Sequence, residues 1–106
     1  MAWINADNLA ADYQGIIAKG NTVRSYSLYA TSNGTLHFST GPSGAFVGSN
    51  SSGTVAAGEW THVCAAVVSG AHEYFINGLP AGAGGSGIVL PGTTDIVPVR
   101  IGNTQE

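Results

Sequence analysis

Glycine-containing turns divide the chain into short segments, and they constrain the fold more than any other feature. Asn33-Gly34 and Asn77-Gly78 each separate two runs rich in β-branched and aromatic residues, which is the pattern of a tight β-hairpin. Apolar residues nowhere recur at helical spacing over a useful window. We therefore predict an all-β chain with strands near residues 2–6, 13–19, 25–31, 35–40, 45–48, 53–56, 60–68, 72–77 and 97–102.

The length and charge of the chain limit the domain count and the partners. With 106 residues, we expect one domain over residues 1–106. Only three cations are present, Lys19, Arg24 and Arg100, and the net charge is -3, so nucleic acid and anionic membrane surfaces are poor partners. The longest apolar run, Val63–Val68, is too short to span a bilayer, and no signal segment opens the chain. A neutral polar ligand fits this composition best.

The first hairpin has two possible turns, and each assigns side chains to faces differently. A two-residue Asn33-Gly34 turn would mix polar and apolar residues on both faces. A three-residue loop, Ser32-Asn33-Gly34 with Gly34 in the left-handed region, pairs Tyr29 with His37 and sorts the faces cleanly. We predict the three-residue loop. The core side then carries Tyr26, Leu28, Ala30, Leu36 and Phe38, and the opposite side carries Ser27, Tyr29, Thr31, His37 and Ser39.

The second half of the chain predicts two further hairpins. One turns near Gly70 and pairs residues 60–68 with residues 72–77, and the other turns at Asn77-Gly78. The segment 60–68 is apolar on both faces, which is typical of a central strand. We expect Cys64 to be a buried thiol, and the glycine-rich residues 82–87 to form the most mobile loop.

An ordered set of motifs resembles the laminin-G-like, concanavalin-A-like jelly-roll domains. The motifs are Ala2-Trp3-Ile4, Gly15-Ile16-Ile17-Ala18-Lys19-Gly20, Tyr26-Ser27-Leu28, Leu36-His37-Phe38, Gly58-Glu59-Trp60-Thr61-His62-Val63, Tyr74-Phe75-Ile76-Asn77-Gly78 and Arg100-Ile101-Gly102. The resemblance implies an antiparallel jelly-roll β-sandwich and an extracellular or cell-surface location. It also implies a shortened form that lacks outer strands. Because unpaired sheet edges invite pairing with another chain, we expect a homo-oligomer or strand exchange through these edges.

Catalysis is not expected from the arrangement of the acids and histidines. Glycoside hydrolysis needs two carboxylates about 5–10 Å apart, whereas the hairpin near Gly70 sets Glu73 opposite Val67 and leaves Glu59 roughly 25 Å away. His62 alternates in phase with Trp60 and Cys64, so we expect a packed histidine, and we expect His72 to be solvated beside its turn. No serine or cysteine stands in a nucleophile-elbow motif.

Calcium is the one cofactor that the resemblance implies, at the rim of the sandwich. The candidate ligands are Asp7 and Asp12, with Asn8 and Asp95 as further oxygen donors. The same residue types are ordinary turn formers, and we favour that interpretation.

The best candidate ligand site is the face that carries Tyr29 and His37, with Ser27, Thr31 and Ser39 around them. Sugars stack on aromatic rings and bind hydroxyl groups at their rims. We expect truncation of Tyr29 to weaken binding with little effect on stability, and we place Trp3 and Trp60 in the core. The same pair is also consistent with simple cross-strand stabilisation or with a dimer interface.

These observations favour a non-catalytic recognition module for carbohydrate. The alternatives are protein–protein adhesion and a self-assembling structural domain, and a fragment of a glycoside hydrolase-type jelly roll fits least well.

Overall fold

The computed structural model describes residues 1–20, 23–41, 46–86 and 96–102. They form nine strands: β1 (Ala2–Ile4), β2 (Gln14–Gly20), β3 (Arg24–Ala30), β4 (Thr35–Gly41), β5 (Val47–Thr54), β6 (Thr61–Val68), β7 (Ala71–Ile76), β8 (Leu79–Gly84) and β9 (Val99–Ile101). No helix occurs among these residues, and hence none that could cross a membrane. The all-β prediction is confirmed.

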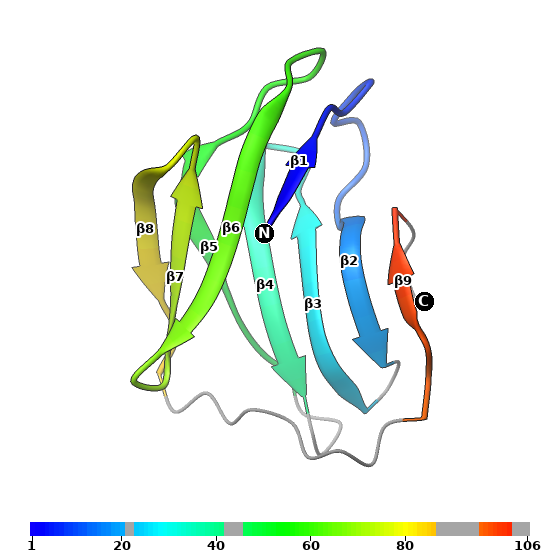
Figure 1. Ribbon diagram of the computed structural model, residues 1–106, viewed down its shortest axis with the longest axis vertical. Coiled ribbons are helices and arrows are strands. Elements are labelled where there is room, and N and C mark those ends of the chain that lie inside the picture. Colours follow the sequence, from blue (N-terminus) through cyan, green and yellow to red (C-terminus); the bar gives the residue numbers. More distant parts are fainter. Residues whose placement is uncertain (21–22, 42–45, 87–95, 103–106) are drawn as a thin grey trace.

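The strands form two antiparallel sheets that pack face to face as a sandwich (Figure 1). One sheet has four strands in the order β1-β6-β7-β8, and the other has five in the order β5-β4-β3-β2-β9. At one side of the sandwich the edge strands β5 and β8 pack against each other. At the other side the edges are the two short strands β1 and β9.

The β3–β4 hairpin has the register that the sorting of its side chains predicts. Ala30 pairs with Leu36 and Tyr29 with His37, so the loop contains three residues. Gly34 ends that loop at φ 82°, in the left-handed region. A Cβ at Gly34 would also lie 2.6 Å from the Val55 carbonyl oxygen, so the turn excludes larger residues on two grounds.

The β6–β7 and β7–β8 hairpins both close through two-residue turns. Ser69 and Gly70 lie at φ 50° and 77°, and Asn77 and Gly78 at 51° and 79°. Positive φ at both central positions matches the right-handed twist of the flanking strands. Both predicted hairpins are confirmed, although Glu73 pairs with Ala66, one residue from the expected position.

The core lies between the sheets and is built from the apolar phase of each strand. Its buried members are Ile16, Leu28, Ala30, Leu36, Val55, Val63, Tyr74 and Ala81. A polar cluster lies beside them, where His72 Nδ1 and the Tyr74 hydroxyl lie 2.8 Å and 2.9 Å from Ser49 Oγ. The Tyr74 hydroxyl also donates to the Ser49 carbonyl, so the cluster links β5 of one sheet to β7 of the other.

One prediction of strands and one of a loop are wrong at the glycine-rich segments. Residues 45–48 and 53–56 were expected as separate strands, whereas β5 runs continuously over Val47–Thr54, and residue 45 lies outside the described residues. Gly82 and Gly84, expected in a mobile loop, belong to β8. A Cβ on Gly82 would lie 2.6 Å from Ser52 Oγ, so this glycine permits close packing of β8 against β5. Gly87, the last residue of the expected loop, lies outside the described residues.

In the four-stranded sheet the predicted burial is wrong for Trp3 in β1, for Trp60 just before β6 and for His72 in β7. Trp3 and Trp60 are 65% and 68% exposed, whereas His72 is fully buried. Side chains along a strand alternate between its two faces. Val63 is buried and points inward, so Trp60 and His62 point outward. The sequence of β6 is apolar in both phases, and alternation therefore does not indicate which phase faces the core.

His62 and Cys64 share the outward phase of β6. Each is half-buried rather than fully buried in the core. The His62 ring packs against Trp3 at 5.3 Å between ring centroids, which confirms a packed histidine but on the outer face of the sheet.

Candidate ligand-binding pocket

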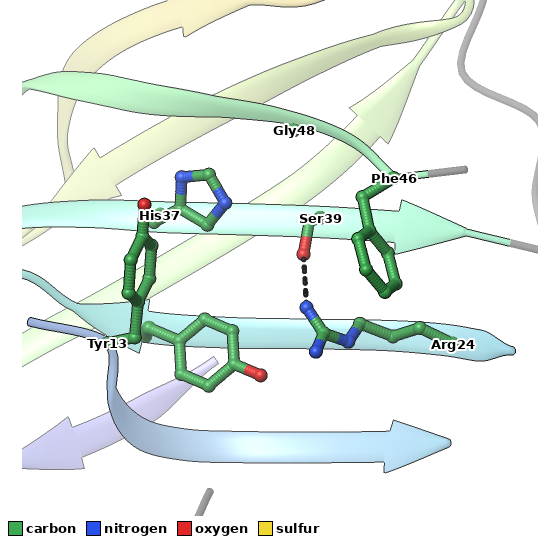
Figure 2. A pocket seen from close by; sticks show the side chains of 7 residues that line it. Tyr13, Arg24, His37, Ser39, Phe46 and Gly48 are labelled. Carbon is green, nitrogen blue, oxygen red and sulfur yellow. Dashed lines mark hydrogen bonds between the residues drawn. The ribbon is translucent and has the colours of Figure 1, made fainter. Parts of the chain in front are cut away.

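A hollow of about 310 Å³ lies on the face of the five-stranded sheet that points away from the four-stranded sheet. Its lining residues come from β3, β4, β5 and the segments just before β2 and β5: Tyr13, Arg24, Tyr29, His37, Ser39, Phe46 and Gly48. Figure 2 shows their side chains gathered over the strands, with Tyr13 and Phe46 toward opposite ends.

Tyr13 forms one wall because the chain turns sharply just before β2. Its backbone lies in the left-handed region at φ 57°. The ring meets Tyr29 and His37 edge-on, with centroid distances of 5.8 Å and 5.2 Å. Tyr13 keeps 48% of its surface exposed, so one part of the ring packs on the sheet and another part borders the hollow.

Phe46 and Arg24 form the opposite wall. The Arg24 guanidinium carbon lies 4.4 Å from the centroid of the Phe46 ring and 5.6 Å from that of Tyr29. Its Nη1 donates a hydrogen bond to Ser39 Oγ at 3.3 Å, drawn as the dashed line in Figure 2. Arg24 is only 6% exposed, while Phe46 is 52% exposed. The charged group is therefore held in place beneath an accessible aromatic ring.

The floor of the hollow depends on a glycine in β5. Gly48 pairs with Ser39, and a Cβ there would lie 2.8 Å from two atoms of the His37 ring. His37 is held by a hydrogen bond between its Nδ1 and Asn50 Oδ1 (2.5 Å). Gly48 therefore lets the imidazole lie flat against the neighbouring strand.

Three of the five predicted ligand residues line the hollow, namely Tyr29, His37 and Ser39. Ser27 lies behind Ser39, fully buried, with 2.9 Å between the two hydroxyl oxygens. Thr31 lies outside the hollow in the β3–β4 turn, where its hydroxyl lies 2.7 Å from that of Thr35.

The expectation that Tyr29 is an accessible platform is wrong. Tyr29 is 2% exposed, and the rings of Tyr13 and His37 and the Arg24 guanidinium all lie against its ring. The expectation that truncation of Tyr29 leaves stability unchanged is corrected for the same reason, since removing a buried aromatic ring costs about 3–5 kcal/mol. The accessible rings are those of Tyr13 and Phe46.

Sequence reasoning missed Tyr13, Arg24, Phe46 and Gly48. None of them carries a local signal for a site, because each looks like an ordinary strand-end, surface or turn residue in the chain. Their common position follows from the pairing of β2 with β3, of β3 with β4 and of β4 with β5. Only that pairing brings residues from these segments to one hollow.

Neither Asp7 nor Asp12, the two carboxylates proposed as the main calcium ligands, is among the residues that line this hollow. Asp12 accepts a hydrogen bond from the Ser32 amide (2.8 Å), and hydrogen bonds from Ser32 lower the pKa of the Asp12 carboxyl. Asn8 Oδ1 accepts from the Ala10 amide, as a turn residue does. Within the described ranges no three His, Cys, Asp or Glu side chains are grouped to hold a metal ion. Asp95 lies outside those ranges, and the calcium site stays a prediction.

The buried cluster of Ser49, His72 and Tyr74 combines a hydroxyl, an imidazole and a phenol, as some catalytic sites do. It lies between the sheets, with His72 fully buried and Tyr74 1% exposed. Burial lowers the pKa of His72, with a smaller contribution from the nearby His37, and burial raises the pKa of Tyr74. Both shifts favour neutral side chains, as expected for a structural core network.

The two antiparallel sheets packed face to face define a β-sandwich of the concanavalin A type. The family described as the concanavalin A-like lectin/glucanases superfamily matches residues 1–106, and the chain belongs to it. No curated protein and no solved structure matches the chain. The resemblance and the sandwich fold expected from the sequence are thus confirmed, and the superfamily description covers both lectins and glucanases.

Proposed function

We propose that this chain is a non-catalytic recognition module that binds a carbohydrate in the hollow on the five-stranded sheet. The observation that carries the proposal is a small hollow with an exposed aromatic ring at each end and polar side chains between them. Its volume, about 310 Å³, is at the lower end of the range for small-molecule sites, roughly 300–1,000 Å³. A hollow of this size can hold a single sugar ring, whereas a protein partner would need a larger contact surface.

The lining has the chemistry that a sugar ring requires. Tyr13 and Phe46 offer apolar ring surfaces for the C–H groups of a sugar, while the half-buried imidazole of His37 offers a hydrogen bond to a hydroxyl group. No carboxylate occurs among the described lining residues. This supports binding over hydrolysis, since glycoside hydrolysis usually uses a pair of carboxylates flanking the bond.

The test is a glycan array on the purified chain, followed by titration of any sugar that binds. Phe46→Ala and Tyr13→Asn should each weaken binding at least about tenfold, because each removes a ring that borders the hollow. Asparagine is chosen for position 13 because it tolerates the left-handed backbone there. Both rings are half exposed, so the variants should stay folded.

Trp3→Ala and Trp60→Ala are the matched controls for this test. They remove equally exposed aromatic rings on the other sheet and should leave affinity unchanged. Full affinity in both hollow variants, or loss of affinity in the tryptophan variants, would place binding elsewhere. Absence of any sugar ligand would count against carbohydrate recognition and favour adhesion to protein.

A second candidate function, self-association, is favoured by the open side of the sandwich. Between β1 and β9 lies a mainly apolar groove of about 280 Å³ whose lining includes Trp3, Ile16 and Ile101. Trp3 and Ile101 are 65% and 81% exposed. We propose a second copy of the chain as the occupant, because both bordering strands are sheet edges.

A further inference from the structure

The hydrogen bond between His37 and Asn50 carries an inference about how the hollow recognises a sugar. We propose that Nε2 of His37 accepts a hydrogen bond from a ligand hydroxyl, and that Asn50, outside the hollow, is the positioning residue that keeps Nε2 an acceptor. The inference rests on the proposed function of the same site, and it adds the direction of the hydrogen bond and the residue that sets it.

The first argument is the tautomer of His37. Its Nδ1 lies 2.5 Å from Oδ1 of Asn50, which is its partner in the pairing of β4 with β5. The carbonyl oxygen of an amide side chain only accepts hydrogen bonds, so Nδ1 carries the proton and donates it. In a neutral imidazole the other ring nitrogen then has a lone pair and no hydrogen. Nε2 is therefore an acceptor.

The second argument is that this acceptor is open to a ligand. His37 is half-buried and lines the hollow, and Figure 2 shows one of its ring nitrogens on the side toward Ser39. Nε2 makes no hydrogen bond within the described part of the chain. Unlike Nε2 of His72, it is not among the buried atoms that lack a partner. A ligand hydroxyl can therefore reach it from the hollow.

The third argument is that the imidazole is held in place. Its ring stacks on that of Tyr29, with 6.4 Å between centroids, and the ring of Tyr13 meets it edge-on at 5.2 Å. On the side of Gly48, an added Cβ would lie 2.8 Å from both Cε1 and Nε2. These contacts and the bond to Asn50 fix the direction of the Nε2 lone pair, so little conformational entropy is lost when a hydroxyl binds it.

The tautomer is tested without any ligand by NMR of the ring nitrogens, because protonated and unprotonated nitrogens resonate far apart. At about pH 8.5, where histidine side chains are neutral, the proton of His37 should be on Nδ1. Asn50→Ala should move it to Nε2 in a large fraction of the molecules, since the acceptor is gone. Asn50→Asp keeps an acceptor oxygen and should keep the proton on Nδ1. A proton on Nε2 in the wild type would overturn the inference.

Two features of position 50 make these variants clean. Asn50 is exposed, so its replacement should leave the chain folded, and thermal unfolding of each variant checks this. Asn5→Ala is the matched control, because Asn5 is an exposed asparagine just after β1 and should affect neither the tautomer nor the binding of sugars. The wild-type measurements decide the matter if a variant does not fold.

The direction of the bond is tested with sugars that cannot donate it. Methyl glucoside, methyl galactoside and methyl mannoside are each titrated against analogues in which one hydroxyl at a time is replaced by fluorine, which donates no hydrogen bond. In a series that binds, replacement at one position should weaken binding at least about tenfold, because Nε2 is left without a partner. The same replacement should cost at most about threefold in Asn50→Ala and the full amount in Asn50→Asp.

The outcomes separate this inference from the proposed function. Equal binding of a sugar and all its fluorinated analogues would overturn the role of His37 and leave carbohydrate recognition standing. A penalty that Asn50→Ala leaves unchanged would overturn the role of Asn50 in the same way. Binding of no sugar in any of the three series would overturn the inference, and a glycan array that is also empty would overturn the proposed function with it.

Discussion

At the scale of single residues, burial changes the chemistry of His72. Its imidazole is fully buried between the sheets, with the Phe38 ring edge-on at 4.8 Å. Nδ1 lies 2.8 Å from Ser49 Oγ, and Nε2 has no hydrogen-bond partner in the described part of the chain. Protonation would therefore place a charge and an unsatisfied N–H group in the core, which is why burial lowers the pKa of His72.

This arrangement predicts that stability falls in mild acid. The pKa of His72 is lowered in the folded state from an ordinary value of 6.5, so the unfolded chain binds the proton first. The free energy of unfolding should be constant above about pH 7.5 and fall below pH 6.5, by at most about 1.4 kcal/mol per pH unit. Urea unfolding at a series of pH values between about 8 and 5 measures it.

Two variants separate His72 from His62. His72→Asn should be less stable at neutral pH but should flatten the decline between about pH 7 and 5, since it removes the titrating group. His62→Asn, at a half-buried position on the outer face, should keep the wild-type slope. If His72→Asn declines as steeply as the wild type, another group causes the acid sensitivity.

At the scale of strands, glycines set how closely β5 and β8 approach. Gly53 lies so near Ala81 that a Cβ on it would be 3.0 Å from the Ala81 Cβ, and a Cβ on Gly84 would be 2.9 Å from that of Ser49. Gly82 adds a positive φ of 101° to a similar approach. The glycine-rich segment is thus a packed strand at the closed side of the sandwich.

Two glycine substitutions distinguish close packing from backbone conformation alone. Gly58→Ala, at φ 79° with nothing within 4 Å of the new Cβ, should cost only the left-handed backbone term, about 1–2 kcal/mol. Gly82→Ala adds a contact of 2.6 Å with Ser52 Oγ and one of 2.8 Å with its amide nitrogen, so it should cost at least about 1 kcal/mol more. Chemical denaturation compares the two, and equal costs would show that β8 is not tightly packed.

At the scale of the whole molecule, the two sides of the sandwich differ. One side is closed by the packing of β5 on β8, and the other side has the three-residue strands β1 and β9 as its edges. Exposed apolar side chains near those edges include Trp3 and Ile101. Unpaired strand edges next to apolar surface are the usual sites of association between chains.

Self-association through this side is tested by light scattering coupled to size exclusion. The wild-type chain should behave as a dimer, and Trp3→Lys and Ile101→Lys should each shift it toward the monomer because a charge would be buried at the interface. Leu79→Lys is the control, since Leu79 is 70% exposed but lies in β8, away from the open side. A monomeric wild type, or dissociation by Leu79→Lys alone, would contradict the proposal.

Hairpin geometry could be predicted from the sequence because it depends on neighbouring residues. Asn77-Gly78 closes a two-residue turn, and Gly34 supplies the left-handed end of a three-residue loop, so the registers of both hairpins follow from local conformation. The separation of Leu28 and Leu36 from Tyr29 and His37 then follows from strand alternation. The family resemblance also follows from the order of these segments.

Burial of the individual faces was decided only by tertiary structure. Alternation separates Tyr29 from Leu28, but it does not reveal that Tyr13 will cover Tyr29, nor that the Trp60 phase of β6 faces outward. These depend on which segments, distant in sequence, pack against each face. The hollow has the same origin, because Arg24, Phe46 and Tyr13 become neighbours only when the sheet forms. The sequence therefore determined the three hairpins and the register of the β3–β4 hairpin, whereas tertiary packing decided which side chains remain accessible to a ligand.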